Sequence, residues 1–337
     1  MSQKIIKISS LVLAAAAAGF STQAFSAGFS LFEQGASGQG VAYAGASAVG
    51  EDASTIYFNP AAMTRLSGQQ IVLAGHIIVP TSEYTDSGQS TLPGGPPGSL
   101  TGPNSDGGST GFVPNFYWAA KLENDLHVGV GVNVPYGLAT EYDDGWVGRY
   151  HGLKSEITTI NICPSMAWKA TDTVSLGFGL SFQYIDIELT NNIFSPAVCQ
   201  RLGGACNTAG DSHIKLEGDD MSIGWNVGVL WNITQKDRLG VAYRSEIKHD
   251  VTGDATYTMD DDPALQAILG LANAGADPFT LFTSTTLLAV ASMPETFSVS
   301  YVRDFNDQWS LLADWTWTGW SSLDTVDIVL TGGAPGA

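Results

Sequence analysis

Cysteine and histidine are the most reactive side chains in this sequence, and their spacing favours a disulfide over a metal site. Cys199 and Cys206 stand seven positions apart with Gly203-Gly204 between them. An exported protein meets an oxidising compartment, so we expect these two cysteines to be bridged, which leaves Cys163 as a packed thiol. The histidines are scattered without partners at ligand spacing. We therefore expect no cofactor, and no metal at His76, His127, His151, His213 or His249.

Enzymes and nucleic-acid-binding proteins are both disfavoured. Serine, histidine and acidic residues occur in the stretches expected to be loops, but no Gly-x-Ser-x-Gly or paired motif organises them into a catalytic constellation. The 14 Lys+Arg stand against 33 Asp+Glu, which gives a formal net charge of −19. A chain this acidic is a poor partner for nucleic acid.

Arg244 is the residue best suited to bind an anion. In the strand expected around it, alternate residues face outward, namely Leu239, Val241 and Tyr243. The other phase then faces inward and carries Arg244, Glu246 and Lys248. An inward arginine could hold a ligand carboxylate through charge-assisted hydrogen bonds. The alternative, which we favour from sequence, is an ion pair with an acid such as Glu51 or Asp52.

Strands must position these residues, because a two-residue periodicity recurs along the chain. Large apolar side chains alternate with small or polar ones in residues 160–168, 174–184, 223–231 and 309–317. Successive side chains of a strand point to opposite faces, so each strand has one large apolar face. In a soluble sandwich that face is the core, whereas in a membrane barrel it faces lipid and the small face lines the interior.

Loop lengths separate these two architectures. The short polar turns are residues 121–125, 169–172, 232–237 and 303–307, and the long connections are residues 82–111, 141–154, 190–213 and 253–286. Alternation of short and long loops is typical of outer-membrane barrels, with short periplasmic turns and longer external loops. We therefore predict an all-β, antiparallel transmembrane β-barrel.

Residues 1–26 have the pattern of a signal peptide. Lys4 and Lys7 form a positive n-region, residues 11–20 form a short apolar h-region, and small residues precede the expected cleavage site. No later stretch reaches the roughly 18 uninterrupted apolar residues that a membrane helix needs. We expect export to the outer membrane of a Gram-negative bacterium, with a mature chain that begins at Ala27.

Residues 27–66 lack the strand pattern and are expected to form a plug for a barrel that starts at residue 67. Gly, Ala and Ser dominate this segment, so its backbone can turn tightly and pack closely, while aromatic residues such as Phe29 supply anchors. Asn59, Pro60 and Ala61 are expected to form a tight turn, because Asn favours turn initiation and Pro fixes its own φ.

Several short motifs follow one another in a specific order through nearly the whole mature chain. They are Ala27-Gly28-Phe29, the run from Gly38 to Gly45, Glu51-Asp52-Ala53, Asn59-Pro60-Ala61, the run from Tyr136 to Tyr142, Tyr243-Arg244-Ser245-Glu246 and Met293-Pro294-Glu295. Together they resemble the FadL family of outer-membrane long-chain fatty acid and hydrocarbon transporters.

The resemblance implies a 14-stranded monomeric barrel that is closed by an N-terminal hatch. Such a barrel takes up hydrophobic molecules, above all long-chain fatty acids, by diffusion without an energy source. Phe29 and the turn at Asn59, Pro60 and Ala61 would belong to the hatch and its gate. Outer-membrane lipid and lipopolysaccharide would surround the barrel.

The third strand carries the expected exit. Its alternating valines are interrupted by Pro135 and Gly137, which flank Tyr136. Proline removes a ladder hydrogen bond and glycine weakens pairing, so a kink or a gap in the wall is expected. In the family, a kinked strand at this place is thought to open sideways to the bilayer. An ordinary strand end is the alternative.

The long connection 253–286 carries the expected landing site for a ligand. Asp262 can cap a helix with Pro263 at its first position, and an apolar stripe follows. Apolar surface in an external loop suggests a groove for a greasy ligand, and a helix packed on its neighbouring loops is an equal alternative. The candidate ligand-binding residues are Leu265, Ile268, Leu269, Phe279 and Phe282, together with Arg244.

Two features depart from the family pattern. Asp186 and Glu188 stand where the fatty acid transporter is expected to carry basic residues, which keeps aromatic or aliphatic hydrocarbons open as ligands. About nine strands are visible in residues 67–337, whereas a single-chain barrel closes with an even number. We therefore expect an incomplete barrel from a C-terminally truncated chain. A structural or adhesin-type barrel is the second alternative function.

Overall fold

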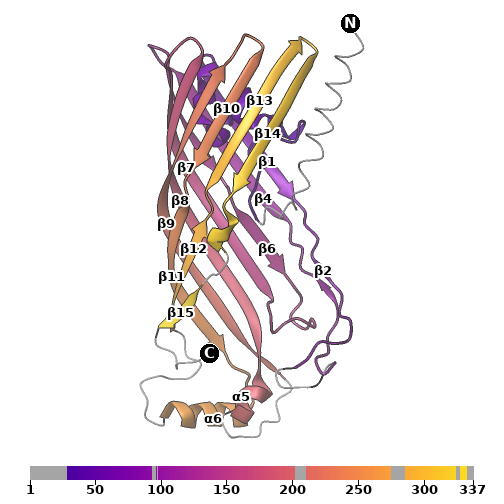
Figure 1. Ribbon diagram of the computed structural model, residues 1–337. Helices are drawn as coiled ribbons and strands as arrows, with labels where there is room; N and C mark the ends of the chain where they lie inside the picture. Colours follow the sequence, from indigo (N-terminus) through magenta and orange to yellow (C-terminus); the bar gives the residue numbers. More distant parts are fainter. Residues whose placement is uncertain are drawn as a thin grey trace.

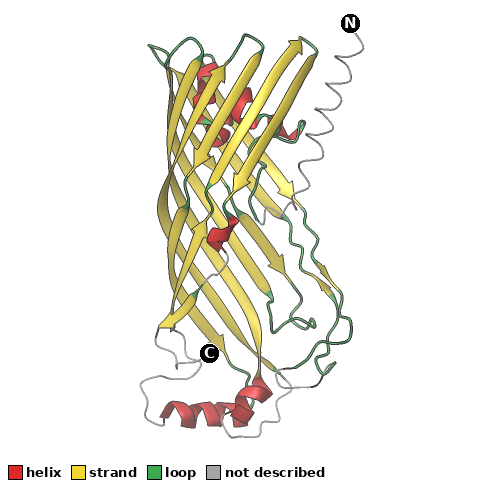
Figure 2. Cartoon of the chain, viewed as in Figure 1, coloured by secondary structure: helices red, strands yellow, loops and turns green. Residues whose placement is uncertain are grey.

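The computed structural model of the chain is built around an antiparallel sheet that curves into the wall of a barrel (Figure 1). The structure describes residues 29–92, 96, 98–201, 210–274, 285–323 and 327–331, so the predicted signal peptide lies outside the described residues. Strands make up most of the described chain (Figure 2). In these ranges, no helix has both the length and the apolar character needed to span a membrane.

Thirteen strands form the sheet, and its main path runs β1-β4-β5-β7-β8-β9-β10-β13-β14. The other four continue interrupted strands: β6 follows β5, β11 follows β10, β12 precedes β13, and β15 follows β14. When each interrupted strand is counted once with its continuation, the described part of the wall has nine strands, as the sequence predicts. Their bounds are β1 (Gln69–Ile78), β4 (Gly111–Lys121), β5 (Leu126–Asn133), β6 (Gly137–Glu141), β7 (Lys154–Lys169), β8 (Val174–Phe194), β9 (Asp211–Asn232), β10 (Asp237–Arg244), β11 (Ile247–Thr258), β12 (Thr285–Met293), β13 (Thr296–Asn306), β14 (Trp309–Thr318) and β15 (Ile328–Thr331).

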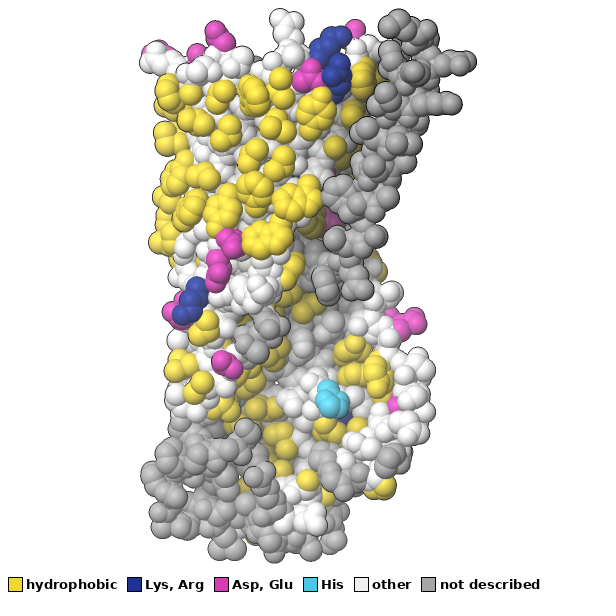
Figure 3. All heavy atoms as spheres, viewed as in Figure 1, with side chains coloured by type: hydrophobic (Ala, Val, Ile, Leu, Met, Phe, Trp, Pro, Cys, Tyr) yellow, Lys and Arg dark blue, Asp and Glu magenta, His cyan; other side chains and the backbone are white. Residues whose placement is uncertain are grey.

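The alternating sequence places the large apolar side chains on the outer face of the sheet. Trp168 and Trp231 are exposed, whereas Ser181 and Asn226, which belong to the other phase, are buried inside. On the face in view, Figure 3 shows the resulting apolar band over the half of the wall nearest the short turns, bordered by charged side chains. A continuous apolar outer face is typical of a barrel wall in contact with lipid, so the predicted outward phase is confirmed.

Short turns and long loops lie at opposite ends of the sheet (Figure 1). The turns that join β4 to β5, β7 to β8, β9 to β10 and β13 to β14 gather at one end. The other end carries the hairpin of β2 (Glu83–Tyr84) and β3 (Ser105–Asp106), and the helices α5 (Ser195–Arg201) and α6 (Pro263–Ala274). The alternation of loop lengths is therefore present as predicted.

Residues 29–66 form a compact N-terminal segment inside the curve of the sheet, near the short turns (Figure 1). Ile56 and Met63 are fully buried in a cluster with Tyr117 of β4. Burying a side chain of this size stabilises by roughly 1.5–3 kcal/mol, so these contacts hold the segment against the wall. Its helical turns are α2 (Ala36–Gln39), α3 (Ala46–Val49), α4 (Thr55–Phe58) and the 3-10 helix η1 (Pro60–Arg65).

The predicted inward orientation of Glu246 and Lys248 is wrong. Both side chains are exposed, whereas Ile247 and His249 are buried. β10 ends at Arg244 and β11 begins at Ile247, so the two residues between the strands break the alternation. Because side chains alternate with a period of two, one extra residue reverses the face of every side chain that follows.

Candidate functional site

The predicted turn at Asn59 is present, and it anchors the N-terminal segment to the wall. The Asn59 side-chain oxygen accepts a hydrogen bond from the backbone N–H of Ala61 (3.0 Å), which caps η1. Its amide nitrogen donates to the carbonyl oxygens of Ser47 (2.7 Å) and Val229 (3.1 Å). Pro60 takes the first position of η1, where a missing N–H is tolerated. The turn is therefore joined both to its own segment and to β9.

Two glycines in the wall make room for this turn. A Cβ atom on Gly228 of β9 would lie 1.9 Å from the Asn59 side-chain oxygen. On Gly177 of β8 it would lie 2.2 Å from the backbone nitrogen of Ala61. A larger residue at either position would push the turn away from the wall.

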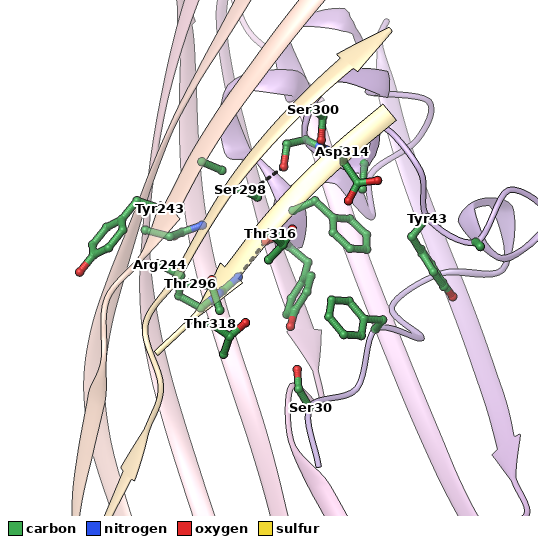
Figure 4. A pocket seen from close by; sticks show the side chains of 18 of the residues that line it. Ser30, Tyr43, Tyr243, Arg244, Thr296, Ser298, Ser300, Asp314, Thr316 and Thr318 are labelled. Atoms are coloured by element: carbon green, nitrogen blue, oxygen red, sulfur yellow. Dashed lines mark hydrogen bonds between the residues drawn. The ribbon is translucent and has the colours of Figure 1, made fainter. Parts of the chain in front are cut away.

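A cavity of about 300 Å³ lies between the N-terminal segment and strands β10, β13 and β14. Figure 4 shows Thr296 and Thr316 on the wall side, with Tyr43 and Ser30 of the N-terminal segment facing them. Hydroxyl groups and the Asp314 carboxylate thus line one side, and the rings of Phe32, Tyr43, Tyr57 and Phe58 line the other. An apolar face opposite a few polar groups suits a molecule with an apolar body and a polar end.

Arg244 brings a positive charge to this cavity. Its side chain is 8% exposed. The guanidinium donates to the carbonyl oxygen of Tyr57 (2.8 Å) and to the Ser181 hydroxyl (3.3 Å), and lies 4.6 Å from the centre of the Tyr57 ring. In the described part of the chain, no carboxylate is within ion-pair distance of Arg244, and the arginine ion pairs there belong to Arg149, Arg238 and Arg303.

The predicted pairing of Arg244 with Glu51 or Asp52 is therefore wrong. Asp52 instead accepts hydrogen bonds from Ser37 (2.7 Å) and Ser54 (2.6 Å), and Glu51 is exposed. The reason is that Arg244 lies against the backbone of α4, where the carbonyl oxygen of Tyr57 accepts its hydrogen bond. A buried charge without an opposite charge is costly, so an anionic group that reached Arg244 would offset this cost.

The barrel wall has an interruption at the predicted kink. β4 and β5 pair from Lys121 and His127 as far as Phe116 and Val132, where their ladder ends. Beyond that point, Gly111–Asn115 of β4 are paired with β1 on one side but not with β6 on the other, in the described ladders. Asn133 pairs with Asn161 of β7 and Gly137 pairs with Thr158, so residues 134–136 face only residues 159–160 and one residue is in excess. We call this unpaired stretch between Gly111–Asn115 and residues 133–137 the first ladder break.

The N-terminal segment covers the first ladder break from inside. The N–H of Leu31 donates to the carbonyl oxygen of Pro135 (2.9 Å), and the N–H of Gly137 donates to that of Phe29 (2.9 Å). These two bonds flank an antiparallel bridge between Ser30 and Tyr136. The segment thus satisfies backbone groups that a continuous ladder would have paired.

Gln34 adds a buried side-chain connection at the same place. It is fully buried, and its amide nitrogen donates to the carbonyl oxygens of Leu31 (2.8 Å) and Val134 (3.1 Å). Its oxygen accepts from the Tyr117 hydroxyl (3.0 Å). Asn115 of β4 also donates to the carbonyl oxygen of Glu33 (2.9 Å). Both edges of the first ladder break are therefore bonded to the N-terminal segment.

Aromatic and aliphatic side chains fill the interior beyond the cavity. The Phe29 ring centre lies 5.9 Å from that of Tyr136 and 5.5 Å from that of Trp320, which belongs to the 3-10 helix η2 (Trp320–Leu323). Buried residues of β8, β11 and β12 continue this cluster, among them Ile185 and Leu287. Barrel interiors are usually polar, so this interior offers an unusual environment for an apolar molecule.

The predicted external helix is present, but two of its apolar side chains are packed. Asp262 accepts from the N–H groups of Ala264 (2.9 Å) and Leu265 (3.0 Å), and α6 begins at Pro263, so the predicted cap is confirmed. Leu265 and Leu269 are buried, and α6 contacts α5. This agrees with the alternative of a helix packed on neighbouring loops. The side chain of Ile268 and the residues Phe279 and Phe282 lie outside the described part of the chain.

The external loops also hold a charged network. Arg149 donates to the Asp211 carboxylate (2.7 Å), and the Tyr150 hydroxyl donates to the same carboxylate. Burial, and next the hydrogen bond to Asp211, raise the pKa of Tyr150 to about 12. The phenol therefore keeps its proton at neutral pH and donates it, which ties residues 149–150 to the external end of β9.

The remaining predictions concern two acids of β8 and the three cysteines. Asp186 and Glu188 follow the outward phase of β8, and Glu188 pairs with Lys154 (3.1 Å) and Lys215 (3.6 Å) of neighbouring strands. Because they face outward, these acids do not oppose a carboxylate inside the barrel. Cys163 is a buried free thiol, as predicted. The Cys199 side chain and Cys206 lie outside the described residues, so the predicted disulfide stays a prediction.

Sequence reasoning missed Pro114, Gln34 and Trp320. Pro114 lies in the part of β4 at the first ladder break, and proline inside a strand pattern is confined to unpaired edges and bulges, so that signal was available. Gln34 is a single polar residue in a segment rich in Gly, Ala and Ser, and nothing in the sequence marks it as buried. Trp320 ends a run of tryptophans that indicates strand rather than an inward 3-10 turn.

Residues 17–335 match a family described as "Outer membrane protein transport protein (OMPP1/FadL/TodX)". A long-chain fatty acid transport protein of Escherichia coli O6:H1 is 31% identical over 337 residues, which cover 96% of this chain and 72% of the relative. A putative outer membrane protein of Neisseria meningitidis serogroup B is 31% identical, with 98% of this chain and 71% of the relative covered.

Solved structures show the same architecture. A FadL homologue of Pseudomonas aeruginosa superimposes with a TM-score of 0.71 at 26% identity, over 91% of this chain and 73% of that structure. The toluene transporter TbuX of Ralstonia pickettii superimposes with a TM-score of 0.61 at 19% identity, over 85% and 73% of the two chains, and so shares the fold.

Proposed function

Because this chain belongs to the outer-membrane transport protein family that includes FadL and TodX, we propose that it carries long-chain fatty acids across the outer membrane. The family consists of outer-membrane transport proteins and not of enzymes. In our proposal, external loops capture the ligand, the apolar interior passes it to the cavity, and residues 27–66 act as a plug. Release occurs sideways, into the membrane, at the first ladder break.

The observation that carries this proposal is the first ladder break with its cover. The strands on its two sides are bonded to residues 29–34 of the plug instead of to each other. Movement of that short stretch would uncover an unpaired part of the wall without breaking the ladder between two strands. The plug would then act as the gate, with Phe29 and the bridge between Ser30 and Tyr136 at its moving end.

Arg244 supports a fatty acid over a plain hydrocarbon. The cavity pairs a buried guanidinium without a carboxylate partner with aromatic rings, which matches a ligand with an anionic end and an apolar body. The relative from Escherichia coli, named a long-chain fatty acid transport protein, supports the same ligand. Aromatic or aliphatic hydrocarbons are the alternative. We also propose that the barrel is monomeric and is surrounded by lipopolysaccharide on its external side.

A reversible disulfide across the gate tests lateral release. Ser30 and Tyr136 form the pair whose flanking residues exchange the hydrogen bonds, so their side chains lie close enough for a bridge. The double variant S30C/Y136C would be produced in a host that lacks its own fatty acid transporter, and uptake of labelled oleate and labelled toluene would be measured before and after reduction.

We expect oxidation to lower oleate uptake and reduction to restore it, while the single variants S30C and Y136C respond to neither. Thiol alkylation and mass spectrometry would establish how much of the double variant is bridged. Unchanged uptake in fully bridged protein would refute release at the first ladder break. Uptake of toluene but not oleate in the reduced protein would favour the hydrocarbon alternative.

A further inference from the structure

β9 loses its pairing on one side in the middle of the wall. It pairs with β10 up to Asn226 and Arg244, and with β11 from Asp219 and Thr252 onward. Between these points every residue is described. Ser245 still exchanges hydrogen bonds with Trp225, but Asp220–Gly224 are not paired with Ile247–Val251. We call this stretch the second ladder break.

The second ladder break lies in the same cross-strand row as the first. Asn133 at the end of β5 pairs with Asn161 of β7, Asn161 pairs with Gln183 of β8, and Gln183 pairs with Ser222 of β9. The interrupted strand of β5 and β6, together with the long strands β7, β8 and β9, therefore forms a panel of the wall with an interrupted ladder at each of its two edges.

In the second ladder break, side chains rather than a backbone ladder connect β9 to β11. A Cβ atom on Gly224 would lie 2.5 Å from Ile247 Cγ1, so Ile247 covers the bare backbone at Gly224. His249 is fully buried, with Nδ1 2.9 Å from the Asp220 carboxylate and Nε2 3.1 Å from the side-chain oxygen of Gln183. Displacing these side chains would open the wall without unpairing any strands.

Apolar surface lies on both sides of this break. On the inside, Ile185, Ile247 and Val251 belong to the buried cluster that also contains Tyr136 of the first ladder break. On the outside, Met221 and Ile223 are each 66% exposed and belong to the apolar band. Irregular backbone at membrane depth persists where it is buried in protein or lines a cavity, and here it separates an apolar interior from lipid.

We propose that the second ladder break is a second lateral opening, through which an aliphatic chain passes between the barrel interior and the membrane. His249 and Asp220 hold it closed, and Ile247 is the side chain that moves aside. This inference rests on the proposed transport function, but it does not depend on release at the first ladder break. Two openings at the two edges of one panel would share one apolar interior and one cavity.

A second reversible disulfide tests the proposal. A cysteine sulfur at position 247 would occupy the place of Ile247 Cγ1, so the variant G224C/I247C brings that sulfur within bonding reach of position 224. Uptake of labelled oleate would be compared in G224C/I247C, in S30C/Y136C and in the variant with both pairs. The four single-cysteine variants are the controls, and bridging would be quantified by thiol alkylation.

We expect the bridge across the first ladder break to remove part of the uptake, and both bridges together to reduce it to background, with recovery after reduction. If the first bridge alone reduces oleate uptake to background, the second opening is overturned and the proposed exit stands. If the second bridge alone lowers oleate uptake and the first bridge alone does not, the proposed exit is overturned and the second opening is supported. Uptake that persists with both bridges complete would overturn both.

A variant that loosens the second ladder break gives an independent readout. H249A removes the side chain that joins Asp220 to Gln183, and S310A, on an exposed part of β14, is its control. In protein bridged between positions 30 and 136, we expect H249A to raise oleate uptake at least severalfold over S310A. Equal uptake by the two, in barrels that migrate as folded protein in unheated gel samples, would contradict the proposal.

Discussion

Asn59 and Arg244 are both buried polar residues, but only Asn59 has partners that match its character. Its amide and carbonyl groups are all bonded to the backbone, so it serves to fix the plug. Arg244 donates one hydrogen bond to a carbonyl oxygen and one to a hydroxyl, and it donates none to a carboxylate among the described residues. Asn59 is structural by its bonding, whereas in our proposal the positive charge of Arg244 is available to a ligand carboxylate.

Arg244→Met is expected to weaken oleate binding and to leave hydrocarbon binding unchanged. Hydrogen bonds to a charged group contribute about 1.5–3 kcal/mol, so the oleate Kd should rise roughly 10- to 100-fold. Titration of purified protein with oleate and with dodecane measures both, and Arg303→Met, at the exposed short-turn end of β13, is the control. An equal loss for oleate and dodecane would mean that Arg244 acts through the fold and not on a carboxylate.

Asn59→Ala is expected to loosen the plug. The carbonyl oxygens of Ser47 and Val229 lose a donor and η1 loses its cap, which together cost about 2 kcal/mol. Urea-dependent protease cleavage within residues 29–66 measures this free energy. Asn232→Ala, at the short-turn end of β9, should change it by less than about 0.5 kcal/mol. A plug of unaltered stability in Asn59→Ala would show that the turn does not anchor it.

At the scale of elements, the plug replaces the strand pairing that β4 and β5 lose beyond Phe116 and Val132. The sequence could predict both partners of this arrangement. The apolar alternation predicts the strands, and Pro135 and Gly137 predict the kink. The small residues before residue 66 predict a segment without strand character. The contact between them could not be predicted, because it depends on the backbone of residues 29–31 and on Gln34, which has no local pattern.

The interruption after Arg244 shows a second limit of sequence reasoning. The apolar alternation of β10 predicts that Glu246 and Lys248 share the face of Arg244. Between Arg244 and Thr252 the chain has one residue more than the facing part of β9, which reverses that phase, and Ile247 then lies against Gly224 of that strand. A pattern along one strand carries no information about such a contact across the sheet.

Gln34→Leu is expected to release the stretch that covers the first ladder break. It removes the bonds to Val134 and Leu31 and leaves the Tyr117 hydroxyl without its acceptor, which costs about 1–3 kcal/mol. Hydrogen exchange at the amides of Leu31 and Gly137 should therefore accelerate roughly 10- to 100-fold, with the amides of β8 unchanged. The control is Gln39→Leu, at an exposed position of α2. Equal exchange in both variants would remove Gln34 from the gate.

At the scale of the whole molecule, an apolar band faces lipid outside, and an apolar cluster lies inside the same wall. The two are separated by strand ladders except at the ladder breaks that flank the panel of β5 with β6, β7, β8 and β9. A water-filled pore has no need of an apolar interior, and a purely structural barrel has no need of interrupted ladders. The combination fits a path in which an apolar molecule leaves through the side of the barrel.

The measurement that tests lateral release most directly is photocrosslinking of the protein, in lipid nanodiscs, to a fatty acid that carries a diazirine, with adducts mapped by peptide mass spectrometry. Our account predicts adducts on cavity residues such as Tyr43 and Thr316 and along the ladder breaks, notably residues 133–137 and 220–224. It predicts none at Thr64 and Arg65, on the short-turn side of the plug. Adducts that continue through the plug to those two residues, with none at either ladder break, would contradict it.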